Sequence, residues 1–133
     1  MKRKIAARGI AFLVVFLVIA GGYAEEWVSF EGRTPTGAKL QLTGILSVPE
    51  GNGPFPAVAM LCGCGGLRDS NDAKQQRAWA ERLLGWGYAS LRLDSFGPRG
   101  YGDICNNLDV VSPSAIAYDA YSAQSFLRAG VKP

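Results

Sequence analysis

The alternation of apolar and polar residues at the start of the chain predicts a β-hairpin. Residues 27–31 and residues 38–48 each alternate between the two kinds of side chain, which is typical of half-buried strands. Between them, residues 34–37 (TPTG) have the composition of a turn. We expect the two strands to pair at the edge of a sheet.

A third strand is predicted by a different pattern, because residues 57–61 (AVAML) are all apolar. Neither face of such a strand is suited to water, and a strand of this kind is typical of a parallel sheet covered on both faces. We predict that this run is a central strand with helices on both sides. Residues 49–56 (PEGNGPFP) before it have the composition of a loop.

Helical spacing predicts a helix over residues 73–86. Asp72 with Gln75 three residues later matches a capping box, and Gly85 and Gly87 mark the end of the helix. One face of this helix is expected to be apolar and to consist of Trp79, Ala80, Leu83 and Leu84. We expect the two tryptophans of this region to take part in core or interface packing.

The remaining pattern predicts a fourth strand, a long loop and a last helix. Residues 88–93 alternate and end before Asp94, and residues 95–107 form the loop. Ser112 is the expected N-cap of the last helix, Pro113 its first residue and Gly130 its end. The apolar stripe of that helix is Ile116, Ala117, Ala120, Ala123 and Leu127. The order β-β-β-α-β-α implies right-handed crossovers and an α/β fold with a parallel sheet.

The N-terminal segment differs from the rest of the chain. Four basic residues lie in the first eight positions, an 11-residue apolar run covers residues 10–20, and Gly22 and Ala24 fit a signal-peptidase site. The run is shorter than the ~20 residues that span a bilayer. We predict a signal peptide over residues 1–24, an exported domain over residues 25–133, and periplasmic or secreted localisation. The alternative is an uncleaved membrane anchor through residues 10–24.

Charge and composition exclude several classes of protein. Beyond the first eight positions the chain carries ten basic and 11 acidic residues, scattered rather than clustered, so no nucleic-acid surface is predicted. The 133 residues contain no histidine, which removes the commonest general base near neutral pH and a common metal ligand. No cofactor and no metal site are predicted.

The glycine-rich turn at residues 62–66 (CGCGG) is the first candidate for chemistry, because ligands of open α/β sheets bind beyond the carboxyl ends of the strands. A dinucleotide fingerprint would need glycine where Arg68 stands, and the Gly-Lys-Ser/Thr ending of a phosphate-binding loop is also missing. The turn instead suits an oxyanion loop, in which a backbone N–H binds a developing negative oxygen.

The segments PAVAMLCGCGGL and WAERLLGWGYASLRLDSFGPRG resemble the N-terminal half of dienelactone hydrolase-family α/β-hydrolases. The chain is similar in particular to the exported branch with a His-Gly-Cys-Gly-Gly turn and an Asp-Ser-Phe-Gly-Pro-Arg-Gly loop, which matches residues 94–100. The resemblance covers residues 44–133. It implies a partial α/β-hydrolase fold that lacks the C-terminal half, and an activity on ester or lactone bonds.

Two departures from this family are visible. Cys62 stands where that branch has histidine, and no Gly-x-Ser-x-Gly nucleophile elbow or equivalent with cysteine occurs in the chain. Because the nucleophile, acid and histidine of the family all follow its first four strands, no complete catalytic site is predicted. The resemblance places an oxyanion donor at the backbone N–H of Cys64, with Gly63, Gly65 and Gly66 shaping the turn.

Two polar residues lie after the fourth strand. The resemblance makes Arg99 a substrate-binding candidate, although an arginine at this position can also tie down its own loop. Asp94 lies at a strand end, and we expect it to bind backbone N–H groups of the turn that follows.

The three cysteines have two interpretations. In an exported protein a disulfide is expected, and Cys64 and Cys105 follow neighbouring parallel strands whose C-terminal loops can meet. We predict a Cys64–Cys105 disulfide, worth roughly 3–4 kcal/mol on the chain-entropy model, with Cys62 as a buried free thiol. The alternative is a thiol or metal module of Cys62, Cys64 and Cys105, for which no histidine completes the ligand set.

Taken together, the sequence predicts a hydrolase-family protein that is inactive alone, with a small ester or lactone as substrate if further segments complete the site. A noncatalytic binding or scaffold protein is the alternative. Apolar surface on the fourth strand and both helices is expected to remain uncovered, which predicts marginal stability or self-association.

Overall fold

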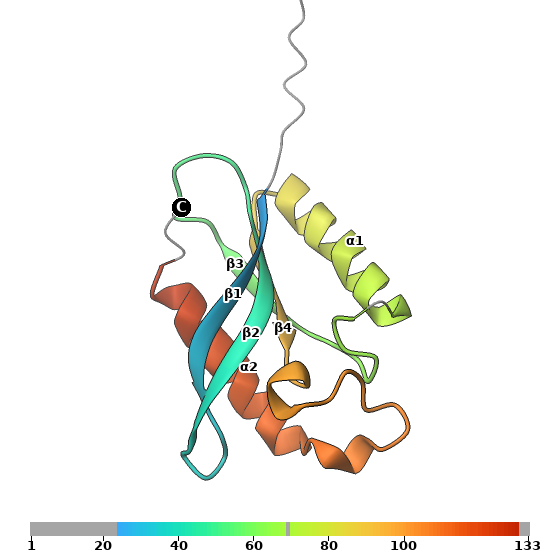
Figure 1. The fold of residues 1–133 in the computed structure, drawn as a ribbon. Coiled ribbons are helices and arrows are strands. Elements are labelled where there is room, and N and C mark those ends of the chain that lie inside the picture. Colours follow the sequence, from blue (N-terminus) through green and yellow to red (C-terminus); the bar gives the residue numbers. More distant parts are fainter. Residues whose placement is uncertain (1–23, 69, 131–133) are drawn as a thin grey trace, which may run out of the picture.

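The computed structural model describes residues 24–68 and 70–130, and these form one four-stranded sheet with a helix on each face (Figure 1). The strands are β1 (Ala24–Arg33), β2 (Lys39–Val48), β3 (Ala57–Leu61) and β4 (Ala89–Asp94). The helices are α1 (Asn71–Gly85) and α2 (Pro113–Arg128), with short 3-10 helices η1 (Gly97–Arg99) and η2 (Leu108–Val110) between β4 and α2. The predicted α/β class and element order are confirmed. The signal-peptide prediction lies outside the described residues except for Ala24, where β1 begins.

The hairpin prediction is confirmed, and the sheet is mixed. The strand order is β1-β2-β4-β3, in which β1, β2 and β4 are antiparallel neighbours while β3 and β4 are parallel. The backbone N–H of Gly37 donates to the carbonyl of Thr34 and closes the turn between β1 and β2.

The prediction that residues 57–61 form the central strand is wrong. In the described structure β3 is an edge strand and β4 lies between β2 and β3. The side chain of Leu61 remains 47% exposed, whereas five of the six residues of β4 are buried. An apolar run predicts a strand that is suited to burial. Whether that strand has a neighbour on one side or on both depends on the other strands of the sheet.

The core lies between the sheet and α2. The buried residues of this cluster come from β1, β2, β4 and α2, and the rings of Phe30 and Phe126 stack with centroids 4.6 Å apart. Ala89, Leu91 and Leu93 share this face of β4, as their alternation predicts. The cluster consists of Phe30, Leu42, Leu46, Leu91, Leu93 and Ala123.

The face of the sheet covered by α1 buries polar side chains among apolar ones. Ser90 and Arg92 of β4 are buried here, and an Arg92 guanidinium nitrogen lies 2.6 Å from Glu25, which also pairs with Arg77 of α1 at 3.0 Å. Of the two alternatives predicted for Trp79, core or interface packing, the structure excludes the core, because Trp79 is 46% exposed and its ring lies beneath the Arg82 guanidinium. Trp86, at the end of α1, is 64% exposed and also lies outside the core. The buried face of α1 is instead made by Gln76 and Ala80, four residues apart.

The N-cap of α1 also differs from the prediction. The Ser70 hydroxyl accepts the backbone N–H of Ala73 at 3.0 Å, so Ser70 is the N-cap and Asp72 lies in the first turn. The N-terminus of α2 agrees with its prediction, since Ser112 accepts from the N–H of Ala115 and Pro113 is the first helical residue. The stripe of α2 is only partly as predicted, because Ala123 is buried while Ala117 is exposed.

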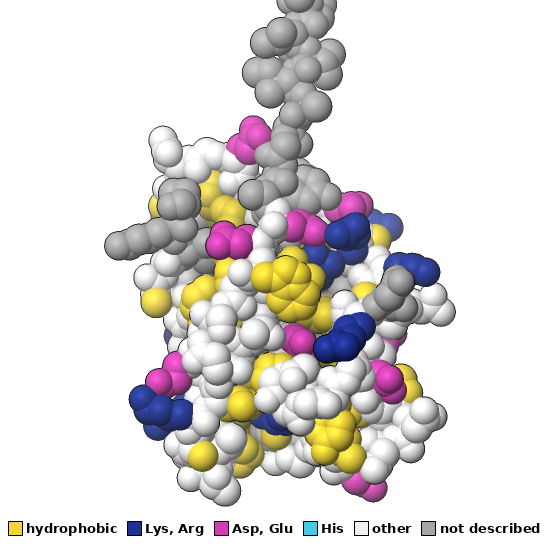
Figure 2. Space-filling model, viewed as in Figure 1, with side chains coloured by type: hydrophobic (Ala, Val, Ile, Leu, Met, Phe, Trp, Pro, Cys, Tyr) yellow, Lys and Arg dark blue, Asp and Glu magenta, His cyan; other side chains and the backbone are white. Residues whose placement is uncertain are grey.

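The surface carries charges of both signs. On the face shown in Figure 2, hydrophobic side chains form separate areas, and basic and acidic side chains are scattered between them. Among the described residues, neither helix has the length and apolar character needed to cross a bilayer.

Candidate oxyanion site at the glycine turn

The glycine turn follows β3 directly and is held by the first turn of α1. The Asp72 carboxylate accepts the backbone N–H of Gly65 at 3.0 Å, and the N–H of Gly66 donates to the carbonyl of Gly63 at 3.1 Å. Asp72 also lies at the N-terminus of α1, where a negative charge is favourable. The carboxylate therefore connects the turn to the helix.

Gly66 is the position at which the turn requires glycine. Its φ is +66°, and a Cβ there would lie 2.7 Å from the carbonyl oxygen of Gly102. This close approach brings the turn against the loop that follows β4. The turn and the loop are therefore packed backbone to backbone.

The predicted Cys64–Cys105 disulfide is present, with 4.8 Å between the two Cα atoms. The N–H of Ile104 donates to the carbonyl of Cys64 at 2.8 Å, beside the disulfide. The two loops are thus joined by a covalent bond and a hydrogen bond. Because two of the three sulfur atoms are in this bond, they cannot act as thiolate ligands, and the described residues hold no group of three or more His, Cys, Asp or Glu side chains that could bind a metal.

The backbone N–H groups of the turn differ in what they bind. The N–H of Gly65 donates to Asp72 of α1 and that of Gly66 to the carbonyl of Gly63, whereas the N–H groups of Gly63 and Cys64 have no acceptor among the described residues. The second of these two, on Cys64, is the N–H that the sequence resemblance selects as oxyanion donor.

A pocket of about 350 Å³ is lined in part by Cys64. Its lining is mostly apolar and comes from the turn, the loop after β4 and the start of α2: Cys62, Gly63, Cys64, Phe96, Ile104, Leu108, Val111, Pro113 and Ile116. A backbone donor without an acceptor, on a residue that lines an apolar pocket, is a candidate to bind a carbonyl oxygen, because low-polarity surroundings strengthen a hydrogen bond.

Cys62 is the free thiol of the chain and is half-buried at the end of β3. Burial raises the pKa of this thiol above its ordinary value; Asp94 and Asp72 nearby raise it further, against a lowering hydrogen bond from the Ser95 backbone. A raised pKa keeps the sulfur protonated near neutral pH, which makes it a poor nucleophile.

Arg99 is positioned by its own loop and by α2. Its guanidinium forms two hydrogen bonds with the Asp119 carboxylate, at 2.7 and 2.9 Å, and a third with the carbonyl of Ser95 at 2.6 Å. Arg99 is not among the residues that line the pocket at the turn. The geometry gives this arginine a loop-anchoring role and does not bring it to the Cys64 N–H.

Asp94 behaves as predicted from its place at a strand end. One oxygen of its carboxylate accepts the N–H groups of Phe96 and Gly97, at 3.0 and 2.8 Å. Sequence reasoning missed the roles of Asp72 and Asp119. For Asp119 a signal was available, because an aspartate inside the apolar stripe of a helix needs a buried cationic partner.

No family model matches the chain, and no curated protein matches it. Two solved structures are similar to it. Hypothetical protein PA2218 from Pseudomonas aeruginosa aligns with a TM-score of 0.52 and 19% identity over 82% of this chain and 32% of that protein. The esterase domain of a Rhodothermus marinus protein aligns with a TM-score of 0.46 and 22% identity, over 81% of this chain and 38% of that one. The chain therefore spans about a third of the length of these structures, and the first of them supports the α/β fold.

Proposed function

We propose that this chain is an exported protein of the dienelactone hydrolase type, which keeps one half of an oxyanion site but does not hydrolyse esters or lactones by itself. The observation that carries the proposal is the Cys64 backbone N–H, which has no acceptor among the described residues and belongs to a residue that lines an apolar pocket. The sequence resemblance over residues 44–133 supplies the substrate class, a small ester or lactone.

The chemistry of the site supports binding without turnover. A hydrogen-bond donor aimed at a carbonyl oxygen stabilises the charge that develops when a nucleophile attacks. Attack also needs an activated nucleophile, and the chain has no histidine to serve as its base. The thiol at Cys62 is kept protonated by its raised pKa. A substrate carbonyl can therefore be bound here while the reacting groups have to come from elsewhere.

Ester hydrolysis by the purified protein tests the inactive part of the proposal. We expect no sustained release of p-nitrophenol from p-nitrophenyl acetate above the buffer rate. The matched control is Cys62→Ser, because acetylation of the thiol would release at most one equivalent and would disappear in this variant. Turnover that continues for many equivalents and survives in Cys62→Ser would refute the proposal.

Export is supported by the disulfide, since disulfides persist in oxidising compartments. Expression of the full sequence in a Gram-negative host, followed by cell fractionation and mass spectrometry of the N-terminus, tests it. We expect a periplasmic protein that begins at Glu25. Recovery in the membrane fraction with Met1 still present would favour the anchor.

A further inference from the structure

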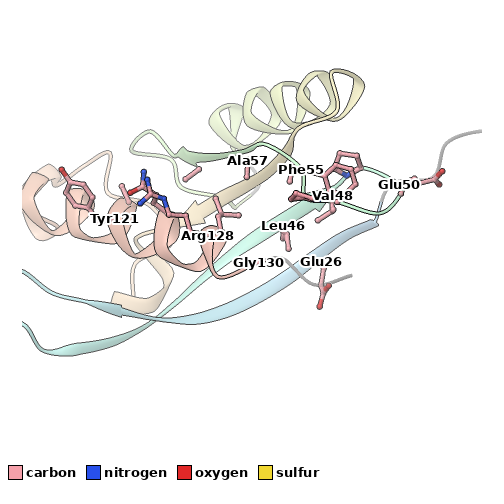
Figure 3. A pocket seen from close by; sticks show the side chains of 18 residues that line it. Glu26, Leu46, Val48, Glu50, Phe55, Ala57, Tyr121, Arg128 and Gly130 are labelled. Atoms are coloured by element: carbon pink, nitrogen blue, oxygen red, sulfur yellow. The ribbon is translucent and has the colours of Figure 1, made fainter.

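A second hollow, larger than the pocket at the turn, lies between α2 and the open edge of β3. It is a groove of about 1110 Å³ (Figure 3). Its floor includes Ala57 and Ala59 of β3, and its wall includes Tyr121 and Leu127 of α2. Tyr121 is 68% exposed. The groove shares no lining residue with the pocket at Cys64.

The edge of β3 beside this groove has no strand partner. β3 pairs with β4 alone, so its other side has no strand partner in the described structure, although the Leu61 carbonyl at its end accepts the Gln76 side-chain amide at 3.2 Å. Its five residues carry no charge and include no proline. Such an edge can pair with another strand, because two features that usually protect an edge, charged side chains and proline, are missing from it.

The opposite edge of the sheet is protected in the usual way. β1 carries Glu25, Glu26, Glu31 and Arg33, and two identical β1 strands brought together would place acidic side chains near one another. The two edges of the same sheet therefore differ sharply in their suitability for self-pairing. Only the β3 edge combines open hydrogen-bonding groups with uncharged side chains.

We propose that the β3 edge binds the β3 edge of a second copy of this chain, antiparallel about a two-fold axis at Ala59, to form a continuous eight-stranded sheet. In this register Ala57 lies opposite Leu61 of the second copy, and Val58 lies opposite Met60. In each of these two pairs a smaller side chain lies opposite a larger one. The side chains of Ala57 and Leu61 are exposed in the single chain, and the pairing covers both.

The charges around the groove fit the antiparallel arrangement. Arg128 on the rim lies near the end of α2, and Glu50 lies in the loop that leads into β3. α2 ends at the same end of the sheet at which β3 begins (Figure 1). The two-fold axis therefore places these charges of the two copies at opposite ends of the contact, so like charges do not face one another.

The size of the contact requires the groove as well as the strand. A stable dimer buries about 800 Å² on each partner, more than a five-residue strand pair provides. The exposed Tyr121 side chains of the two α2 helices lie on the same face of the joined sheet and supply the additional apolar contact.

Disulfide trapping tests the register directly, with protein expressed from the full sequence and purified in the form recovered. In a Cys62→Ser background, Ala59→Cys places two thiols across the axis, within the 4.4–6.8 Å between Cα atoms that a disulfide accepts. We expect a covalent dimer on mild oxidation. Glu31→Cys on the β1 edge, in the same background, is the matched control and should stay monomeric. Equal crosslinking of the two variants, or none at position 59, overturns the proposal.

Sedimentation velocity supplies a second test that does not depend on oxidation. Wild type should form a dimer at micromolar concentration, and Ala57→Lys or Leu61→Glu alone should raise the dissociation constant at least about tenfold. The double variant places the introduced lysine opposite the introduced glutamate at both sites and should recover the dimer. A monomer at 100 µM wild type, a co-purified foreign polypeptide on this edge, or failure of the double variant to recover overturns the proposal.

Discussion

The guanidinium of Arg99 forms two hydrogen bonds with the carboxylate of Asp119, whose side chain is completely buried. This pair fastens the loop after β4 onto α2. A carboxylate buried to this extent needs a cationic partner and further hydrogen bonds to offset its lost hydration. The pair therefore explains why an aspartate stands in the middle of the otherwise apolar face of α2.

Removing one member of this pair should be strongly destabilising. Asp119→Ala leaves the mostly buried Arg99 guanidinium without its counter-charge, and we expect a loss of about 3 kcal/mol in the free energy of unfolding measured in urea. Glu31→Ala is the control, since it breaks an exposed pair with Lys39 and should leave the urea midpoint unchanged. Similar midpoints for the two variants would show that the buried pair contributes nothing.

The disulfide between Cys64 and Cys105 should contribute to stability through the loop that it closes. With a sequence separation of 41 residues, replacing both cysteines by serine should cost roughly 2–4 kcal/mol in urea unfolding. Thiol titration of the denatured wild type should give one free thiol without reductant and three with it. Three thiols without reductant would mean that the bond does not form.

Gly66 should be less replaceable than another glycine of the same backbone conformation. Gly66→Ala and Gly100→Ala both introduce a side chain at positive φ, but only the first also meets a backbone carbonyl, while position 100 is open. We expect Gly66→Ala to lower the thermal midpoint clearly more than Gly100→Ala. Equal shifts would mean that the close approach to Gly102 is not a constraint on the fold.

The thiol of Cys62 should make stability fall at alkaline pH. Its folded-state pKa is raised above the ordinary value near 9.0, so the folded chain holds the proton more tightly than the unfolded chain does. This stabilisation is complete below the unfolded pKa and is lost as pH rises through the higher folded pKa. Chemical denaturation between pH 8 and pH 11 should show a decline that is shallower in Cys62→Ser. Parallel curves would place the thiol in a water-like environment.

Most of the strand and helix positions could be predicted from the sequence, because their local patterns are strong. The apolar run 57–61 and the Ser112-Pro113 start of α2 are examples. The arrangement of the sheet was harder to predict, because β4, its central strand, buries Ser90 and Arg92 on the α1 face. The apolar β3 lies at the edge instead. The pattern of apolar residues predicts which side chains are suited to the core, but it does not predict which polar side chains, such as those of Ser90 and Arg92, are buried.

The candidate site shows the same division. The turn, the disulfide and the role of Asp94 follow from local spacing and from the meeting of neighbouring loops. The pairing of Arg99 with Asp119 could not be predicted in this way, because the two residues are far apart along the chain. The contact of Asp72 with Gly65 was missed because the capping-box pattern assigned Asp72 another role. A capping-box pattern at Asp72 was misleading, because Ser70 already supplies the cap and leaves the carboxylate free to bind the turn.

The central claim is that the Cys64 N–H of the glycine turn binds a carbonyl oxygen in the adjacent pocket. Titration of ¹⁵N-labelled protein with γ-butyrolactone, followed by amide chemical shifts, tests this most directly. We predict a saturable shift centred on the Cys64 amide, and its loss in Leu108→Trp, which fills the pocket from an exposed position. An unmoved Cys64 amide, or the same shift in Leu108→Trp, would contradict the claim.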